Sequence, residues 1–174
     1  MTKVKLEIIK KPAFNAVGYK WQGTFEEAGK GGIHALHVQM KENVRFVQPI
    51  IDPDVLLGIN YHNIPGGFTH YITVEVSDGH PVPDCMESLN IPERWYARHT
   101  HERGEDITST YEMISDRIRE CGYRPLREEN MEVYDQLPIK LELYKFDLIG
   151  SENPEFEILI PIESGSNEGQ AEID

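Results

Sequence analysis

The chain has 174 residues, of which 39% are hydrophobic and 27% charged, and its formal net charge at neutral pH is −13. This length suits one domain with one sizeable core, and the composition excludes a wholly disordered chain. The negative charge argues against binding to DNA or to an anionic membrane, because both need clustered lysine and arginine.

We expect no signal peptide at the N-terminus. The sequence starts in a strand pattern, and no apolar run approaches the roughly 18 residues needed to cross a bilayer, so we expect a cytoplasmic protein. Cys85 and Cys121 stand in unrelated contexts, which is typical of reduced structural thiols. Residues 164–174 are polar and acidic without periodicity and predict a disordered tail, which leaves residues 1–163 as a single domain.

The first half of this domain, about residues 1–80, shows two strand patterns, a helix pattern and two further strand patterns. The strands alternate apolar with polar or small residues, and the helix places apolar residues three or four positions apart. The predicted elements are strands over 4–9 and 14–25, a helix with apolar positions Ile33, Leu36, Met40 and Val44, and strands over 55–63 and 70–78.

The second half, about residues 90–163, repeats this order. Asp106 is placed to cap a helix, and Gly122 suits its left-handed end. The predicted elements are a strand over 94–104, a helix over 106–122, and strands over 131–136 and 156–162. The repeat predicts an α+β fold of two tandem strand-helix-strand-strand units, related by a pseudo-two-fold axis and forming a concave ligand groove. In this register Tyr71 and Glu157 are symmetry mates that point at the central cleft.

Glu157 stands in FEILIPI (156–162), a segment that is otherwise apolar. Side chains alternate along a strand, so Phe156, Ile158 and Ile160 share a core face and Glu157 lies on the opposite face. That face is either solvated or lines a cavity. In a cavity an ionised carboxylate pairs with an entering cation, whereas a protonated one serves as a general acid or base.

Aromatic and acidic residues of the predicted strands are further pocket candidates. Glu132 and Tyr134 share one face of 131–136, where they either belong to a pocket or face solvent. Trp21 and Trp95 either contact a ligand or fill the core, as large aromatic side chains often do.

Metal and cofactor sites are not expected. His34 and His37 are three residues apart on a predicted helix, and His99 and His101 share a strand face, but no acidic partner stands at a telling spacing. No glycine-rich phosphate loop leads from a strand into a helix, so we predict no nucleotide site.

Three segments in this order resemble the GyrI-like small-molecule-binding domain, also called the AraC-type effector-binding domain. They are YARHTHERGEDITSTYEMI (96–114), EVYDQ (132–136) and the closing EILIPI (157–162), and the resemblance covers about residues 3–163. It implies a ligand-sensing domain with an aromatic-walled cleft and an acidic residue that attracts lipophilic cations. It also implies Glu157 as that residue, with Tyr71, Trp95 and Tyr134 as wall residues.

The expected function is therefore that of a stand-alone domain that senses or scavenges a small lipophilic molecule, either neutral or cationic, without direct contact with DNA. For a cationic ligand, Glu157 is the expected counter-charge. The resemblance leaves two alternatives open. One is a hydrolase that opens cyclopropane-bearing xenobiotics in the same cleft, with Glu157 as catalytic residue. The other is a protein that acts on a partner, such as a regulator or gyrase.

Overall fold

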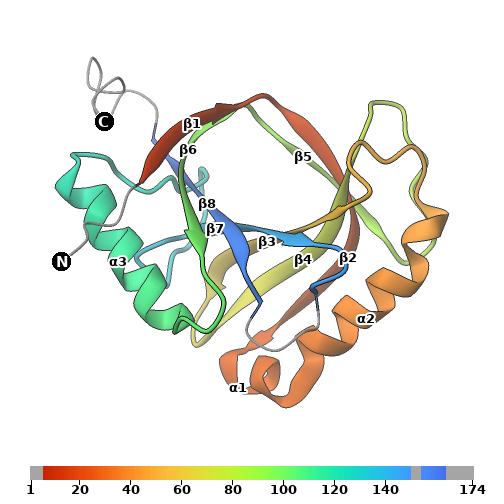
Figure 1. Ribbon diagram of the computed structural model, residues 1–174, viewed down its shortest axis with the longest axis horizontal. Helices are drawn as coiled ribbons and strands as arrows, with labels where there is room; N and C mark the ends of the chain where they lie inside the picture. Colours follow the sequence, from red (N-terminus) through yellow and green to blue (C-terminus); the bar gives the residue numbers. More distant parts are fainter. Residues whose placement is uncertain (1–5, 150–153, 164–174) are drawn as a thin grey trace.

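The computed structural model describes residues 6–149 and 154–163, and it shows one antiparallel eight-stranded sheet with helices on one side (Figure 1). The strand order is β1-β6-β8-β7-β3-β4-β2-β5. The strands are β1 (Glu7–Lys11), β2 (Phe14–Thr24), β3 (Val55–Ile64), β4 (Gly67–Val76), β5 (Glu87–Ile91), β6 (Arg94–His101), β7 (Ile139–Lys145) and β8 (Phe156–Ile162). The helices are α1 (Phe25–Glu27), the π-helix η1 (Ala28–Gly32), α2 (Ile33–Asn43), the 3-10 helix η2 (Val44–Phe46) and α3 (Ile107–Glu120).

Two long, bent strands close the sheet into a ring. In one of them β1 continues into β2, and in the other β5 continues into β6. Only residues 12–13 separate β1 from β2, and only residues 92–93 separate β5 from β6. The first bent strand pairs with the second on both sides of the bend, β1 with β6 and β2 with β5. The two ends of the strand order therefore meet across the top of the ring in Figure 1.

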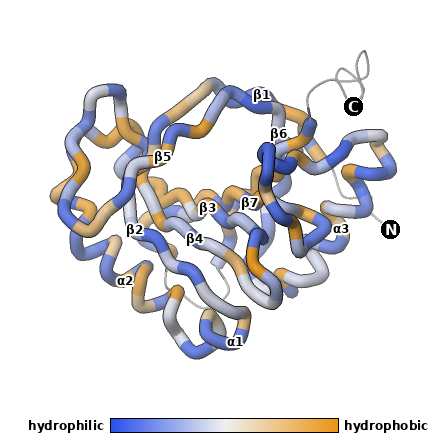
Figure 2. The backbone as a smooth tube through the Cα atoms, turned by 180° about the vertical axis from the view of Figure 1, so that it is seen from behind, coloured by the Kyte–Doolittle hydropathy of each residue, from blue (hydrophilic) through white to orange (hydrophobic). Residues whose placement is uncertain are grey.

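The ring has an inner and an outer face, and hydrophobic and hydrophilic residues alternate along its strands (Figure 2). The outer face carries the helices: α2 buries Met40 against it, and Ile114 and Ile118 of α3 pack with Ile158 of β8. The inner face forms a core of its own, made of Phe14, Ala16, Leu57, Ile59, Ile91, Tyr96, Met131, Ile139, Leu141 and Leu159.

The two halves of the chain meet at the β3–β7 pair, where Ile59 lies opposite Leu141. Outward from this pair the order is β3, β4, β2 in the first half and β7, β8, β6 in the second. The α+β class is confirmed, whereas the two-fold axis between the halves stays a prediction.

Several predicted elements are confirmed. Asp106 caps α3 by accepting a hydrogen bond from the Ser109 amide at 3.0 Å, and Gly122 follows the helix with φ at +84°. The strands β3, β4, β6 and β8 and the helix α2 also lie where the sequence patterns place them, within a few residues at each end.

The strand predicted over 131–136 is wrong, and the true strand, β7, starts at Ile139. Residues 131–138 instead form an irregular connection, in which the Asp135 carboxylate accepts from the Leu137 amide at 2.8 Å. The side chain thus takes a backbone donor that a strand would offer to its neighbour. The strand β5 had no counterpart in the predicted elements, and the predicted tail at 164–174 lies outside the described residues. Within the described ranges no helix is long and apolar enough to cross a membrane.

Candidate functional site

A groove of about 490 Å³ opens on the outer face of the sheet, between the α1–η1 segment and α3. Its floor is the β3–β7 junction, where the two halves of the chain meet. The lining residues are Phe25, Ala28, Gly29, Asn60, His62, Phe68, Ile107, Thr108, Tyr111, Glu112, Lys140 and Glu142. We call this space the outer groove.

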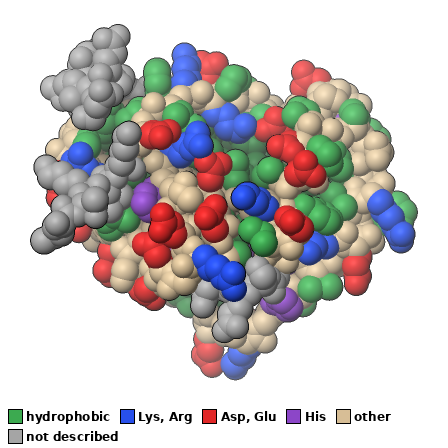
Figure 3. Space-filling view, viewed as in Figure 1, with side chains coloured by type: hydrophobic (Ala, Val, Ile, Leu, Met, Phe, Trp, Pro, Cys, Tyr) green, Lys and Arg blue, Asp and Glu red, His purple; other side chains and the backbone are tan. Residues whose placement is uncertain are grey.

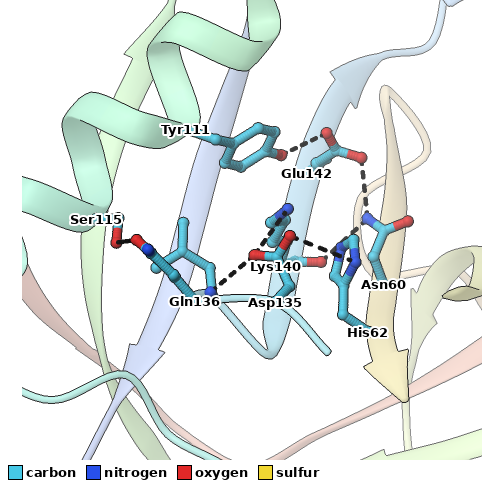
Figure 4. Close-up of polar contacts among 9 residues, drawn as sticks. Asn60, His62, Tyr111, Ser115, Asp135, Gln136, Lys140 and Glu142 are labelled. Atoms are coloured by element: carbon cyan, nitrogen blue, oxygen red, sulfur yellow. Dashed lines mark hydrogen bonds and ion pairs between the residues drawn. The ribbon is translucent and has the colours of Figure 1, made fainter. Parts of the chain in front are cut away.

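Glu142 lies on the floor of the outer groove, partly buried (Figure 4). Its Oε2 accepts a hydrogen bond of 2.6 Å from the Tyr111 hydroxyl, and its Oε1 accepts one of 3.0 Å from Asn60 Nδ2. The residue opposite Glu142 on β3 is Gly58. Both carboxylate oxygens are therefore held by uncharged donors, which satisfy the carboxylate without neutralising it.

The tyrosine hydroxyls at this carboxylate stay protonated. Burial raises the pKa of Tyr111 well above its usual range, and the negative charge of Glu142 raises it further. The pKa of Tyr144 is raised for the same two reasons. Tyr111 is thus a neutral hydrogen-bond donor at physiological pH.

Lys140 is the cation of the outer groove, and only 8% of it is exposed. Its Nζ lies 3.6 Å from Asp135 Oδ1 and 4.4 Å from the centre of the Tyr111 ring. Burial lowers the pKa of Lys140, and the nearby carboxylates of Asp135 and Glu142 oppose that shift. His62, 3.9 Å from Asp135, is neutral at physiological pH, because burial and Lys140 lower its pKa to about 4. Asp135 balances Lys140, so Glu142 is left as surplus negative charge.

An aromatic wall stands on the α1 side of the groove. Phe25 and Phe68 stack with ring centres 5.5 Å apart, and His62 stacks on Phe68 at 5.4 Å. Phe25 is 52% exposed, so its ring is available at the groove mouth. An aromatic face next to a carboxylate is the combination that attracts organic cations.

On the face of the molecule seen in Figure 3, acidic and basic side chains lie among hydrophobic ones. A second cavity, of about 530 Å³, lies at the start of β6 and contains Trp95. Four of its charged residues form two ion pairs, Lys10 with Glu93 at 2.9 Å and Arg94 with Glu128 at 2.6 Å. No surplus charge comparable to that of Glu142 results from these two pairs.

Glu157 and Tyr71 both lie on the inner face of the ring, away from the outer groove. Glu157 Oε1 forms an ion pair of 2.5 Å with Arg98 Nη2. Tyr71 packs edge-on against Tyr61, with ring centres 6.1 Å apart. Glu157 and Tyr71 therefore share a face, while the symmetry predicted between them stays a prediction. Glu157 already has a cationic partner in Arg98. Its role in ligand binding stays a prediction.

The other predicted residues are scattered. Glu132 and Tyr134 are exposed, and Tyr134 donates to Glu132 at 2.8 Å in the connection before β7. Their common strand face does not exist, because residues 131–136 form no strand. Trp21 packs on Phe68 behind the aromatic wall, with ring centres 5.4 Å apart. The six predicted residues therefore do not form one site.

The principal residues of the outer groove were missed in the sequence. A signal was present in IKLELYK (139–145), where Lys140, Glu142 and Tyr144 alternate with apolar residues as in a strand. Asn60 and His62 alternate in the same way along β3.

The predicted histidine pairs have local partners. The His37 ring lies 3.0 Å from the His70 ring, and the His101 ring 2.9 Å from the Thr110 hydroxyl. Over residues 6–149 and 154–163, no group of three or more His, Cys, Asp or Glu side chains is placed to hold a metal ion.

Known proteins share both sequence and fold with this chain. The transcriptional regulator BrlR of Pseudomonas aeruginosa is 30% identical over 132 residues, which are 74% of this chain and 47% of BrlR. The chain thus spans about half the length of this relative.

Two solved structures show the same fold. SAV2435 bound to tetraphenylphosphonium superposes with a TM-score of 0.63 at 13% identity, over 96% of this chain and 99% of SAV2435. A hydrolase from Listeria innocua superposes with a TM-score of 0.52 at 11% identity, over 94% of each chain. At these identities the likeness concerns the fold alone.

The profile of the family Cass2, integron-associated effector binding protein, matches residues 7–162. This range contains all eight strands described above and every residue that lines the outer groove. The chain therefore belongs to the integron-associated effector binding protein family, which has the GyrI-like effector-binding fold.

Proposed function

We propose that the protein binds a small lipophilic cation in the outer groove, with Glu142 as the counter-charge. The observation that carries this proposal is the Glu142 carboxylate, whose two oxygens accept hydrogen bonds from uncharged donors, Tyr111 and Asn60. A partly buried carboxylate without a cationic partner gains from pairing with an entering cation.

The shape and lining of the groove support an organic ligand. Its volume of about 490 Å³ lies within the range of small-molecule sites. The rings of Phe25 and Tyr111 come from the two sides of the groove, and each aromatic contact with a cation contributes roughly 0.5 to 2 kcal/mol. SAV2435, which shares the fold, has been solved with tetraphenylphosphonium, a lipophilic cation.

Glu142 fits this role better than Glu157. The Glu157 carboxylate is paired with Arg98, so an external cation would have to displace a guanidinium that is tethered next to it. Glu142 would exchange no ion pair on binding. The two residues also lie on opposite faces of the sheet, so they cannot act on one ligand together.

The test is a titration with tetraphenylphosphonium, followed by calorimetry, on the wild type, Glu142→Gln and Glu157→Gln. Glu142→Gln keeps the size of the side chain and should weaken binding at least about tenfold, which corresponds to 1.4 kcal/mol. Glu157→Gln is the matched control and should change the affinity less than about twofold. An equal loss in both variants, or a loss in Glu157→Gln alone, would contradict the proposal.

The same groove suits one chemical alternative, a hydrolase. The Tyr111 hydroxyl lies 2.6 Å from Glu142, so the pair holds a proton between a phenol and a carboxylate. Analysis of the ligand after incubation separates the two functions: a binding protein returns it unchanged, whereas a hydrolase returns a product in amounts that exceed the protein.

A further inference from the structure

We infer that His70, which is hydrogen-bonded to His37, positions the Asn60 side chain so that its NH₂ group donates a hydrogen bond to the Glu142 carboxylate. The expected effect of this donor on ligand affinity rests on the proposed function. The arrangement itself is tested separately, without any ligand.

A continuous chain of polar contacts leads from α2 to the outer groove. His37 Nε2 on α2 lies 3.0 Å from His70 Nε2 on β4. His70 Nδ1 lies 2.7 Å from Asn60 Oδ1 on β3, and Asn60 Nδ2 lies 3.0 Å from Glu142 Oε1 on β7. His70 is 2% exposed and Asn60 5%, so water contributes little to either group.

The contacts of Asn60 decide which end of its amide points where. Its Nδ2 lies between two acceptors, Glu142 Oε1 at 3.0 Å and the Lys140 carbonyl oxygen at 3.1 Å. The amide has two N–H donors, and both are used there. A flipped amide would place its oxygen against both of these acceptors. The remaining atom, Oδ1, is an acceptor and therefore needs a donor from His70.

This requirement determines the tautomers of both histidines. His70 is neutral at physiological pH, because burial and the neighbouring His37 lower its pKa to about 3. A neutral ring carries one proton, so a donor at Nδ1 leaves Nε2 of His70 as an acceptor. His37 must then carry its proton on Nε2. In this series of contacts each residue thus donates a hydrogen bond to the next one, from His37 through His70 and Asn60 to Glu142.

Removal of the His70 donor would leave Asn60 Oδ1 as a buried, unsatisfied acceptor. An orphaned buried acceptor carries a substantial free-energy cost, so the amide would turn to seek another partner. The NH₂ group would then leave Glu142 Oε1. His70 is not itself a lining residue of the groove, and its polar contact on this side is with Asn60, so it reaches Glu142 through that side chain. Its ring also lies edge-on to Phe68 of the aromatic wall, with ring centres 6.5 Å apart.

The first experiment measures the tautomers by long-range ¹H–¹⁵N correlation NMR on the ligand-free wild type at pH 7. We expect the His70 proton on Nδ1 and the His37 proton on Nε2. A His70 proton on Nε2 would overturn the inference. This measurement requires neither a variant nor a ligand, so it decides the point even if substitutions at this buried position prevent folding.

The second experiment compares two amide replacements in tetraphenylphosphonium binding. The amide nitrogen of an asparagine corresponds in position to Nδ1 of histidine, and that of a glutamine to Nε2. His70→Asn should stay within about twofold of the wild type, whereas His70→Gln should lose about fivefold, the effect of one ordinary hydrogen bond. If Glu142→Gln loses affinity as expected, equal affinities of the two His70 variants would overturn the inference. If instead Glu142→Gln binds like the wild type, the proposed function fails and the tautomer result stands.

Discussion

Glu142 and Glu157 lie on the adjacent strands β7 and β8 and face opposite sides of the sheet. Both are partly buried, but Glu157 interrupts an apolar strand, whereas Glu142 shares its face of β7 with Lys140 and Tyr144. They differ in their partners: Arg98 neutralises Glu157, while Tyr111 and Asn60 hold Glu142 without adding charge. The comparison teaches that the neighbours of a carboxylate, and not its place in an apolar strand, decide whether it can receive an external cation.

The largest expected effect is acid destabilisation that originates on the outer face. The pKa values of His37 and His62 are lowered to about 4 and that of His70 to about 3, mainly by burial. In the unfolded chain these rings titrate near 6.5, so between pH 6.5 and 4 the unfolded state binds more protons than the folded state. As the pH is lowered through this range, the free energy of unfolding should therefore decrease by up to about 1.4 kcal/mol per pH unit for each histidine.

Urea denaturation at several pH values between 7 and 4.5 measures this slope. His62→Phe is the informative variant, because it retains a ring to stack on Phe68 and removes one titrating group. Because the variant lacks one titrating group, the slope of its free energy of unfolding against pH should be smaller by up to about 1.4 kcal/mol per pH unit. If the variant and the wild type give parallel curves, His62 does not contribute to the acid sensitivity.

A smaller effect is expected from substitution of Lys140, the lysine that lines the outer groove. Lys140→Met removes a positive charge near Glu142 and leaves Asp135 without its partner. At separations of about 10 Å one charge contributes roughly 1 to 2 kcal/mol, so tetraphenylphosphonium should bind about tenfold more tightly.

Lys20→Met is the matched control for the inner face. It changes the net charge equally, and Lys20 Nζ lies 5.9 Å from the Tyr71 ring. We expect a change below about twofold in this variant, measured by the same calorimetric titration. Similar gains in both variants would indicate that overall charge governs binding, and not the local composition of the groove.

Local signals in the sequence were sufficient for much of the fold. Asp106 and Gly122 mark the ends of α3, and alternation marks β8, because caps and strand faces depend on neighbours along the chain. Alternation alone did not decide the position of β7, although residues 139–145 show it. Residues 131–136 also alternate, and the turn at Asp135 that excludes them from the sheet depends on a local side-chain bond.

The site was harder to predict than the fold, because its residues lie far apart in the sequence and meet only through tertiary packing. Glu142 finds its donors 31 residues away in Tyr111 and 82 residues away in Asn60. The contact with Asn60 requires β7 to pair with β3 in the observed register. An error in the position of β7 therefore moves the expected acidic residue to another strand and to the other face.

The smallest effect is expected for Arg98→Met, and it separates the two carboxylates most directly. The side chains of Arg98 and Glu157 are 41% and 35% exposed, so the loss of their ion pair should reduce stability by less than about 1 kcal/mol in urea denaturation. The substitution leaves Glu157 without its cation, while Glu142 keeps both of its donors. If Glu142 is the counter-charge, tetraphenylphosphonium affinity stays unchanged, and adding Arg98→Met to Glu142→Gln restores none of the lost binding. A rise in affinity on freeing Glu157 would instead place the ligand on the inner face, as the sequence pattern first indicated.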